Sequence, residues 1–126
     1  MRNLEIATIV NAYLGQKGKE GYKLPAAIAW KRRVNMDKLI KAKELIDEAL
    51  RDIGKNYMDD EHSVKAENGD RQVKPAFRQE FFKAQAEILE QDTEVDIRKV
   101  SIADLGDIEL SDADMDTLAF MIEEGE

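Results

Sequence analysis

The feature that most constrains this chain is a long stretch of helical periodicity from Pro25 to Tyr57. Apolar side chains recur there at steps of three and four residues, which places them on one side of a helix with 3.6 residues per turn. These positions are Ile28, Leu39, Ala42, Ile46, Ala49, Leu50, Ile53 and Tyr57. Pro25 suits the first helical position, where its missing N–H needs no partner. A helix of this length extends roughly 45 Å at 1.5 Å per residue, so other elements must cover its apolar side.

A second helix and a turn indicate what lies beside the long helix. Pro75 opens a stretch with an apolar stripe at helical spacing. The stripe consists of Phe77, Phe81, Ala84 and Ile88. Between the two helices, Asn68-Gly69 is flanked by short β-prone runs, and a two-residue type I′ turn there pairs Val64 with Val73. We therefore expect a long antiparallel helical hairpin with a small β-hairpin at its tip.

Short elements are expected at both ends of the chain. Asn3 is a suitable N-cap, and Gly15 a suitable stop, for a short apolar helix that packs on the long one. Residues 93–102 are rich in β-branched side chains, which predicts a strand. Its candidate partners are residues 108–110 and an extended piece near residues 22–24.

The last predicted element is a short helix that is apolar on nearly all sides. Ser111 and Asp114 have the spacing of a capping box, and the helical pattern continues through Ile122. Together these elements predict a single domain over residues 1–126. Its fold class is mainly α (α+β): a long antiparallel helical hairpin with a small β-hairpin tip, a short N-terminal helix, and a small sheet with a short C-terminal helix.

Composition and charge exclude several classes of function. The chain has no cysteine, which excludes disulfides, thiolate metal sites and cysteine nucleophiles. No apolar run approaches the length that spans a membrane, so we expect a cytoplasmic protein, in a bacterial host, that is a monomer or homodimer. The net charge of −8 is unevenly distributed, because basic residues concentrate in 17–43 and acidic residues in 44–126. The two parts either attract each other within the fold or meet charged partners.

The basic segment carries one alternative function, the binding of nucleic acid. Its candidate contacts are Lys17, Lys19, Lys31, Arg32, Arg33, Lys38 and Lys41. Gly15-Gln-Lys-Gly18 also matches the short G-x-x-G clamp of KH domains. However, Lys31, Arg32 and Arg33 are consecutive and spread around a helix instead of forming one stripe, which disfavours this alternative.

A second set of residues is a candidate for binding a protein partner. Arg32 and Asn35 are polar side chains on the apolar side of the long helix, and Trp30 lies off its main stripe. Phe120 and Met121 point away from the main stripe of the last helix, which leaves them available to a partner. The predicted contact set is Trp30, Arg32, Arg33, Asn35, Phe120 and Met121.

No catalytic, cofactor or metal signature is found in the sequence. Asp59, Asp60, Glu61 and His62 form an acidic run beside the single histidine, and such a run is ordinarily solvated. An EF-hand-like spacing falls on a stretch whose capping signals predict a helix, which argues against calcium. That spacing comprises Asp112, Asp114, Asp116 and Glu123. We therefore expect a protein that is not an enzyme and has no cofactor and no metal.

Motifs along the chain resemble a family of small proteins of unknown function carried by phages and prophages of Gram-positive bacteria. The matching positions are Leu24-Pro25 with Ala29, Lys31, Asn35 and Leu39, then Glu94-Val95-Asp96-Ile97, Ile108-Glu109-Leu110-Ser111 and Phe120-Met121-Ile122-Glu123-Glu124. The resemblance implies a phage or prophage origin, where small acidic proteins often bind a host protein. The leading expectation is thus a host-protein binder, including an inhibitor of a defence nuclease such as a CRISPR effector.

Two further possibilities stay open beside this expectation. The first is a component of virion assembly, which would form an ordered homo-oligomer. The second is an acidic surface that imitates the phosphates of nucleic acid toward a DNA-binding host protein. The acids that would form it are Asp104, Asp107, Asp112, Asp114 and Asp116.

Overall fold

In the computed structural model the chain is mainly helical, with two small sheets, and residues 1–16, 24–106 and 112–123 are described. The elements are α1 (Asn3–Gln16), α2 (Ala26–Asn56), β1 (Ser63–Lys65), β2 (Arg71–Val73), α3 (Pro75–Leu89), β3 (Val100–Ser101), α4 (Ile102–Leu105), α5 (Asp112–Leu118), the 3₁₀ turn η1 (Ala119–Met121) and β4 (Ile122–Glu123). The predicted α+β class is confirmed.

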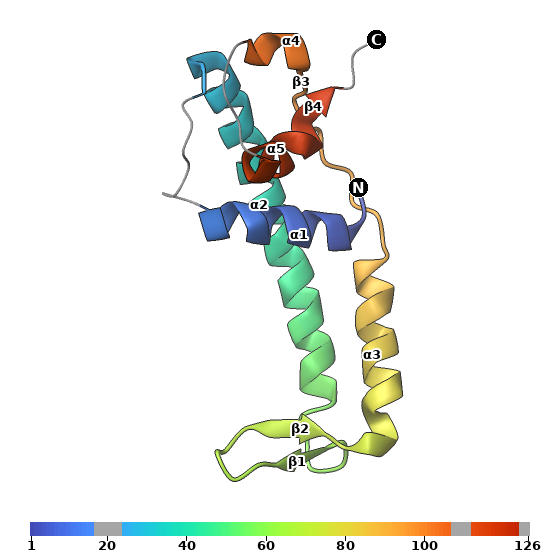
Figure 1. The fold of residues 1–126 in the computed structure, drawn as a ribbon. Coiled ribbons are helices and arrows are strands. Elements are labelled where there is room, and N and C mark those ends of the chain that lie inside the picture. The colour runs from blue at the N-terminus through green and yellow to red at the C-terminus, as the bar shows by residue number, and fades with distance from the viewer. Residues whose placement is uncertain (17–23, 107–111, 124–126) are drawn as a thin grey trace.

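Helix α2 is the axis of the molecule (Figure 1). Helix α3 runs antiparallel to its second half, and the β1–β2 hairpin closes the far end, as predicted. We call residues 42–91 the arm. Helix α1 crosses α2 above the arm, and the elements from β3 to β4 gather around the first half of α2. We call these described parts outside the arm the head.

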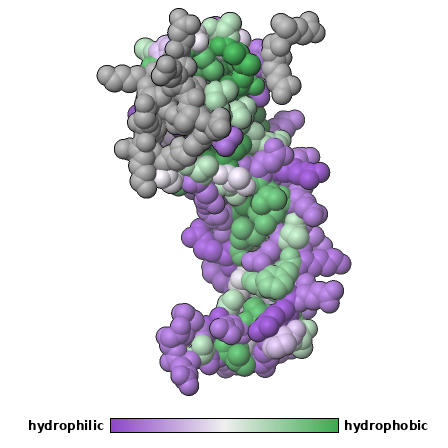
Figure 2. Space-filling model, viewed as in Figure 1, coloured by the Kyte–Doolittle hydropathy of each residue, from purple (hydrophilic) through white to green (hydrophobic). Residues whose placement is uncertain are grey.

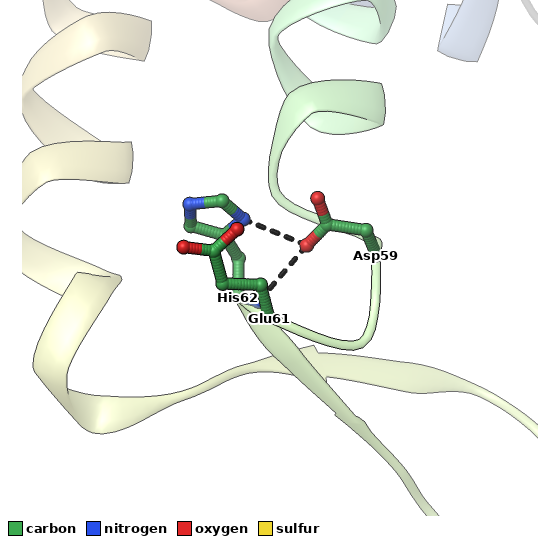
Figure 3. Close-up of side chains that lie close together, drawn as sticks. All are labelled: Asp59, Glu61 and His62. Carbon is green, nitrogen blue, oxygen red and sulfur yellow. Dashed lines mark hydrogen bonds and ion pairs between the residues drawn. The ribbon is translucent and has the colours of Figure 1, made fainter.

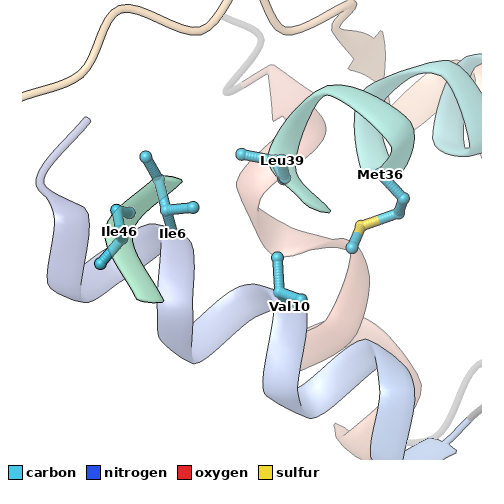
Figure 4. Packing of buried hydrophobic residues seen from close by; sticks show 5 residues of the cluster. All are labelled: Ile6, Val10, Met36, Leu39 and Ile46. Carbon is cyan, nitrogen blue, oxygen red and sulfur yellow. The ribbon is translucent and has the colours of Figure 1, made fainter. Parts of the chain in front are cut away.

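The main core lies where α1 crosses α2 (Figure 4). Ile6 and Val10 from α1 meet Met36, Leu39 and Ile46 from α2, and all five side chains are at most 5% exposed. The apolar side chains of the predicted first helix therefore pack against the long helix. Full burial of one such side chain contributes about 1.5–3 kcal/mol, so this crossing fixes α1 firmly on α2.

A second core holds the last elements against the beginning of α2. Its buried residues are Ile28, Val100, Leu105, Leu118 and Met121. The helix predicted to run through Ile122 ends at Leu118, and the chain continues through η1 into β4. This prediction was wrong because Ile122, although at helical spacing, pairs with Val100 in a parallel two-stranded sheet.

The predicted strand therefore pairs with a different segment from those expected. The strand expected at 93–102 is limited to β3, and it pairs with β4 at the end of the described chain. Residues 108–110 and 22–23 lie outside the described residues, and Leu24 is not in a strand. Before β3, residues 93–99 run without strand assignment beside α2, where side chains of α2 bond their backbone.

The register of the β-hairpin also differs from the prediction. Val64 pairs with Gln72, and Ser63 pairs with Val73, so Val64 and Val73 face opposite sides. The loop has one residue more than a type I′ hairpin allows, because Gly69 adopts φ +90° after a turn closed by its N–H donating to the carbonyl of Ala66. This is a turn followed by a glycine bulge.

The two ends of α1 and the start of α2 also differ from the prediction. The side chain of Asn3 is bonded to residues outside α1, since its Nδ2 donates to the carbonyl of Ile88 and its Oδ1 accepts from the hydroxyl of Thr93. Gly15 lies within α1 and does not end it. Pro25 precedes α2 instead of occupying its first turn. Asn3 thus joins α1 to the end of α3, which anchors the arm to the head.

Candidate functional site

The predicted partner contacts divide into exposed and buried residues. Trp30 is 62% exposed and Arg33 is exposed, so both remain available to a partner. Asn35 and Met121 are fully buried and Arg32 is 8% exposed, which removes these three from the contact set. Phe120 is half-buried between the two cores.

The polar residues on the apolar side of α2 are explained by the segment that covers it. Asn35 Nδ2 donates to the carbonyl of Arg98 at 2.9 Å, and Asn35 Oδ1 accepts from the Arg98 N–H at 2.8 Å. The side-chain amide of Asn35 thus makes the pair of hydrogen bonds that a residue of a neighbouring β-strand would make. The guanidinium of Arg32 lies over the ring of Tyr13, 5.1 Å from its centroid, a cation–π contact that joins α2 to α1.

Two of the basic residues predicted to contact nucleic acid are engaged within the fold. Lys31 donates to the carbonyl of Lys99, and Lys38 donates to the carbonyl of Asp96. Arg33 and Lys41 are exposed, and Lys17 and Lys19 lie outside the described residues. Gly18 of the G-x-x-G match also lies outside them. The basic half of α2 thus helps to hold residues 96–99 in place.

The acidic run at the tip forms a small cluster (Figure 3). One donor atom from each of Asp59, Glu61 and His62 lies within 4.8 Å of the others, while Asp60 pairs with Arg71 at 2.8 Å. His62 Nδ1 lies 2.7 Å from Asp59 Oδ1, and the backbone N–H of His62 donates to the same oxygen. These hydrogen bonds lower the pKa of Asp59.

The histidine ring also has a packing role. It makes edge contacts with the rings of Tyr57 and Phe77, with centroid separations of 5.4 and 4.6 Å. These contacts fasten the loop to α2 and α3. Asp59 and Glu61 are exposed to solvent, so the arrangement is that of a structural corner, and the prediction of no metal stays a prediction.

The arm has a large uncovered surface. Helix α3 contributes no buried residue, although its apolar stripe contains Phe77, Phe81 and Ile88. Figure 2 shows a hydrophobic strip along the arm with hydrophilic residues at both edges. Near the tip, Phe82 is 59% exposed. It lines a hollow together with Met58, Arg71, Gln72, Val73, Arg78 and Phe81.

A groove of about 210 Å³ lies between α2 and α3 where the arm joins the head. It is lined by Asn3, Ala42, Leu45, Ile46, Ala49, Ile88, Gln91 and Thr93. Leu45 is 69% exposed, the highest value among the large hydrophobic side chains described as exposed. Sequence reasoning missed Leu45, although its place off the main stripe of an amphipathic helix was a usable signal.

The comparisons with known proteins add no assignment. No protein-family model, no curated protein and no solved structure matches this chain. Among the described residues, none of the helices combines the length and the apolar composition that crossing a membrane requires. The arm is therefore the candidate functional site on physical grounds, because it holds the uncovered apolar surface described above.

Proposed function

We propose that this chain is a non-enzymatic protein of a phage or other mobile element that binds a host protein in the bacterial cytoplasm through its arm. Inhibition of a defence nuclease, such as a CRISPR effector, is one form that this binding would take. The single observation that supports the proposal is the uncovered arm, in which the whole of α3 has no buried residue.

The physical argument concerns how helices are stabilised. An amphipathic helix gains most of its stability by burying its apolar face. In the arm, α3 packs on one side of α2 only, so Phe81 and Ile88 keep part of their surface in water. Exposed apolar surface that is contiguous and bordered by polar residues is typical of protein–protein contacts. Phe82 and Arg78 beside the tip hollow belong to residue types that dominate binding energy at interfaces or are enriched there.

Of the alternatives, the binding of nucleic acid receives less support from the arrangement of side chains. Binding of nucleic acid would depend on exposed cations, and Lys31 and Lys38 are bonded to backbone carbonyls of the head. A virion component would present surfaces that propagate an ordered assembly. The expectation of a non-enzymatic protein rests on the sequence, which offers a single histidine and no cysteine for nucleophilic chemistry.

The experiment is affinity capture from a bacterial host lysate after nuclease treatment, with mass-spectrometric identification. We expect one host protein in stoichiometric amount, retained by the control Leu14→Glu and lost with Phe82→Glu. Leu14 is a matched control because it is 52% exposed but lies on α1, outside the arm. Recovery of nucleic acid, of the bait alone as a large assembly, or of a partner indifferent to Phe82→Glu would overturn the proposal.

A further inference from the structure

The groove between α2 and α3 has the form of a helix-binding site. Ile46 is at its floor with 5% exposure, the small side chains of Ala42 and Ala49 leave room above it, and Leu45 and Ile88 form apolar walls. Small residues between two helices let a third backbone approach closely. A third helix laid along this groove would complete a bundle that α2 and α3 leave open.

The edges of the groove are acidic on both helices. On α2, Glu48 follows Leu45 by three residues and Asp52 follows Ala49 by three, so both carboxylates border the lining residues, and Asp52 also pairs with Lys55 at 3.9 Å. On α3, Glu87 precedes the lining residue Gln91 by one turn. All three acidic side chains are exposed.

Toward the tip, charges of both signs lie along the two helices. Glu80 lies two turns before Glu87 on α3 and is exposed. Partial burial and the nearby Glu80 carboxylate raise the pKa of Tyr57, which places Glu80 beside α2 as well. Lys41 at the head end, Lys83 one turn before Glu87, and Lys55, which pairs with Asp52, are positive, so the acidic character is greatest beside the groove itself, at Glu48 and Glu87.

This charge pattern selects among the occupants of the groove. A second copy in a symmetric dimer would place the same surface against itself, and would bring these carboxylates together. Like charges face to face are unfavourable at an interface. A helix with cationic flanks would instead meet complementary charge on both edges.

We infer that the groove binds an amphipathic helix of the partner protein whose small apolar stripe enters between α2 and α3 and whose flanks carry lysine or arginine. This inference rests on the proposed function, because it specifies the chemistry of the partner segment that the arm would bind. The apolar stripe would contact Leu45 and Ile88, and the basic flanks would lie along Glu48 and Glu87.

The test uses the full chain and two synthetic helical peptides of about 18 residues with the same alanine and leucine stripe. One peptide carries lysine on both flanks and the other carries glutamate. Fluorescence anisotropy is expected to show at least about tenfold tighter binding of the lysine peptide, weakening as salt is raised. Amide NMR shifts are expected at Ala49 and Ile88. Equal binding of both peptides, or binding of neither, would overturn the inference.

Matched variants separate the groove from charge in general. Leu45→Glu is expected to weaken binding of the lysine peptide at least about tenfold, and Leu14→Glu to leave it unchanged. Glu87→Lys is expected to weaken it, and Glu94→Lys, an exposed acid outside the groove, to have little effect. Equal loss with each control, or a dimer by sedimentation that Leu45→Glu dissociates, would contradict the inference.

The same variants distinguish failure of this inference from failure of the proposed function. A host protein captured by the wild type and lost with Phe82→Glu, but retained in full by Leu45→Glu, would leave the arm as the binding site and remove the groove as the place of contact. Capture of no host protein would remove the proposed function itself. The peptide result would then describe an affinity without a biological partner.

Discussion

Replacement of Asn35 by alanine is expected to destabilise the head. The side chain is fully buried and exchanges two hydrogen bonds with the backbone of Arg98, at 2.8 and 2.9 Å. Each such bond contributes about 1 kcal/mol net. Both hydrogen bonds are only partly buried, which limits the penalty of leaving the backbone groups of Arg98 without these partners. We therefore expect Asn35→Ala to lower the free energy of unfolding by about 2 kcal/mol.

Urea denaturation followed by circular dichroism measures this loss. A slope of about 1–3 kcal/mol per M urea, ordinary for a small protein, converts it into a midpoint lower by roughly 1 M. Asn56→Ala is the matched control, because Asn56 is exposed at the end of the same helix. Hydrogen exchange gives a second readout, since the amide of Arg98 is expected to exchange faster. A loss below about 0.5 kcal/mol with unchanged exchange at Arg98 would refute the role assigned to Asn35.

Three further changes test the tip and the caps. Gly69→Ala is expected to lower the free energy of unfolding by about 1 kcal/mol because Gly69 has φ +90°. The control is Gly54→Ala in helix α2, where an added Cβ meets no heavy atom within 4 Å, and it is expected to stabilise the protein. Thermal denaturation compares the two variants. Hydrogen bonds from His62 lower the pKa of Asp59 in the folded protein, so the Asp59 carboxylate stabilises the fold above its ordinary pKa of 3.8. This stabilisation is lost as the pH falls through the lower pKa of the folded state, so the melting temperatures of wild type and Asp59→Asn are expected to converge in acid. Ser101→Ala removes a capping box and is expected to lower stability by about 1 kcal/mol, with Ser101→Thr close to wild type, as measured by urea denaturation.

The long elements were predictable because helical periodicity is local. Side chains at three- and four-residue steps revealed α2 and α3 within a residue or two of their ends, and Pro75 marked the start of α3 correctly. The capping box from Ser101 to Asp104 has an equally local signal that the prediction did not include, and Ser111, where a capping box was predicted, lies outside the described residues.

The small sheets were less predictable because their registers depend on distant or subtle choices. The β3–β4 pair joins Val100 to Ile122 through strands of two residues, too short for an alternating pattern. At the tip, Asn68-Gly69 fits both a type I′ turn and a turn with a glycine bulge, and the two differ by one residue in register. That single residue decides whether Val64 faces the protein or solvent.

The residues of the candidate site were likewise only partly predictable from the sequence. Helical angles placed Asn35 correctly on the apolar side of α2, but they could not show that the backbone of Arg98 covers it. Leu45 lies at the margin of the same helix and remains exposed because α3 packs to one side of it. Which part of an amphipathic surface is covered depends on tertiary packing, which a single sequence does not encode in its spacing.

The parallel pairing of β3 with β4 has a consequence for synthesis on the ribosome. The arm closes through contacts between neighbours along the chain, which form early and quickly. The head cannot complete its sheet until Ile122 has left the exit tunnel. At about 5–20 residues per second, a nascent chain therefore exposes the first half of α2 for a few seconds while the arm is already formed. During this interval the arm, which carries the proposed binding surface, is present before the head is complete.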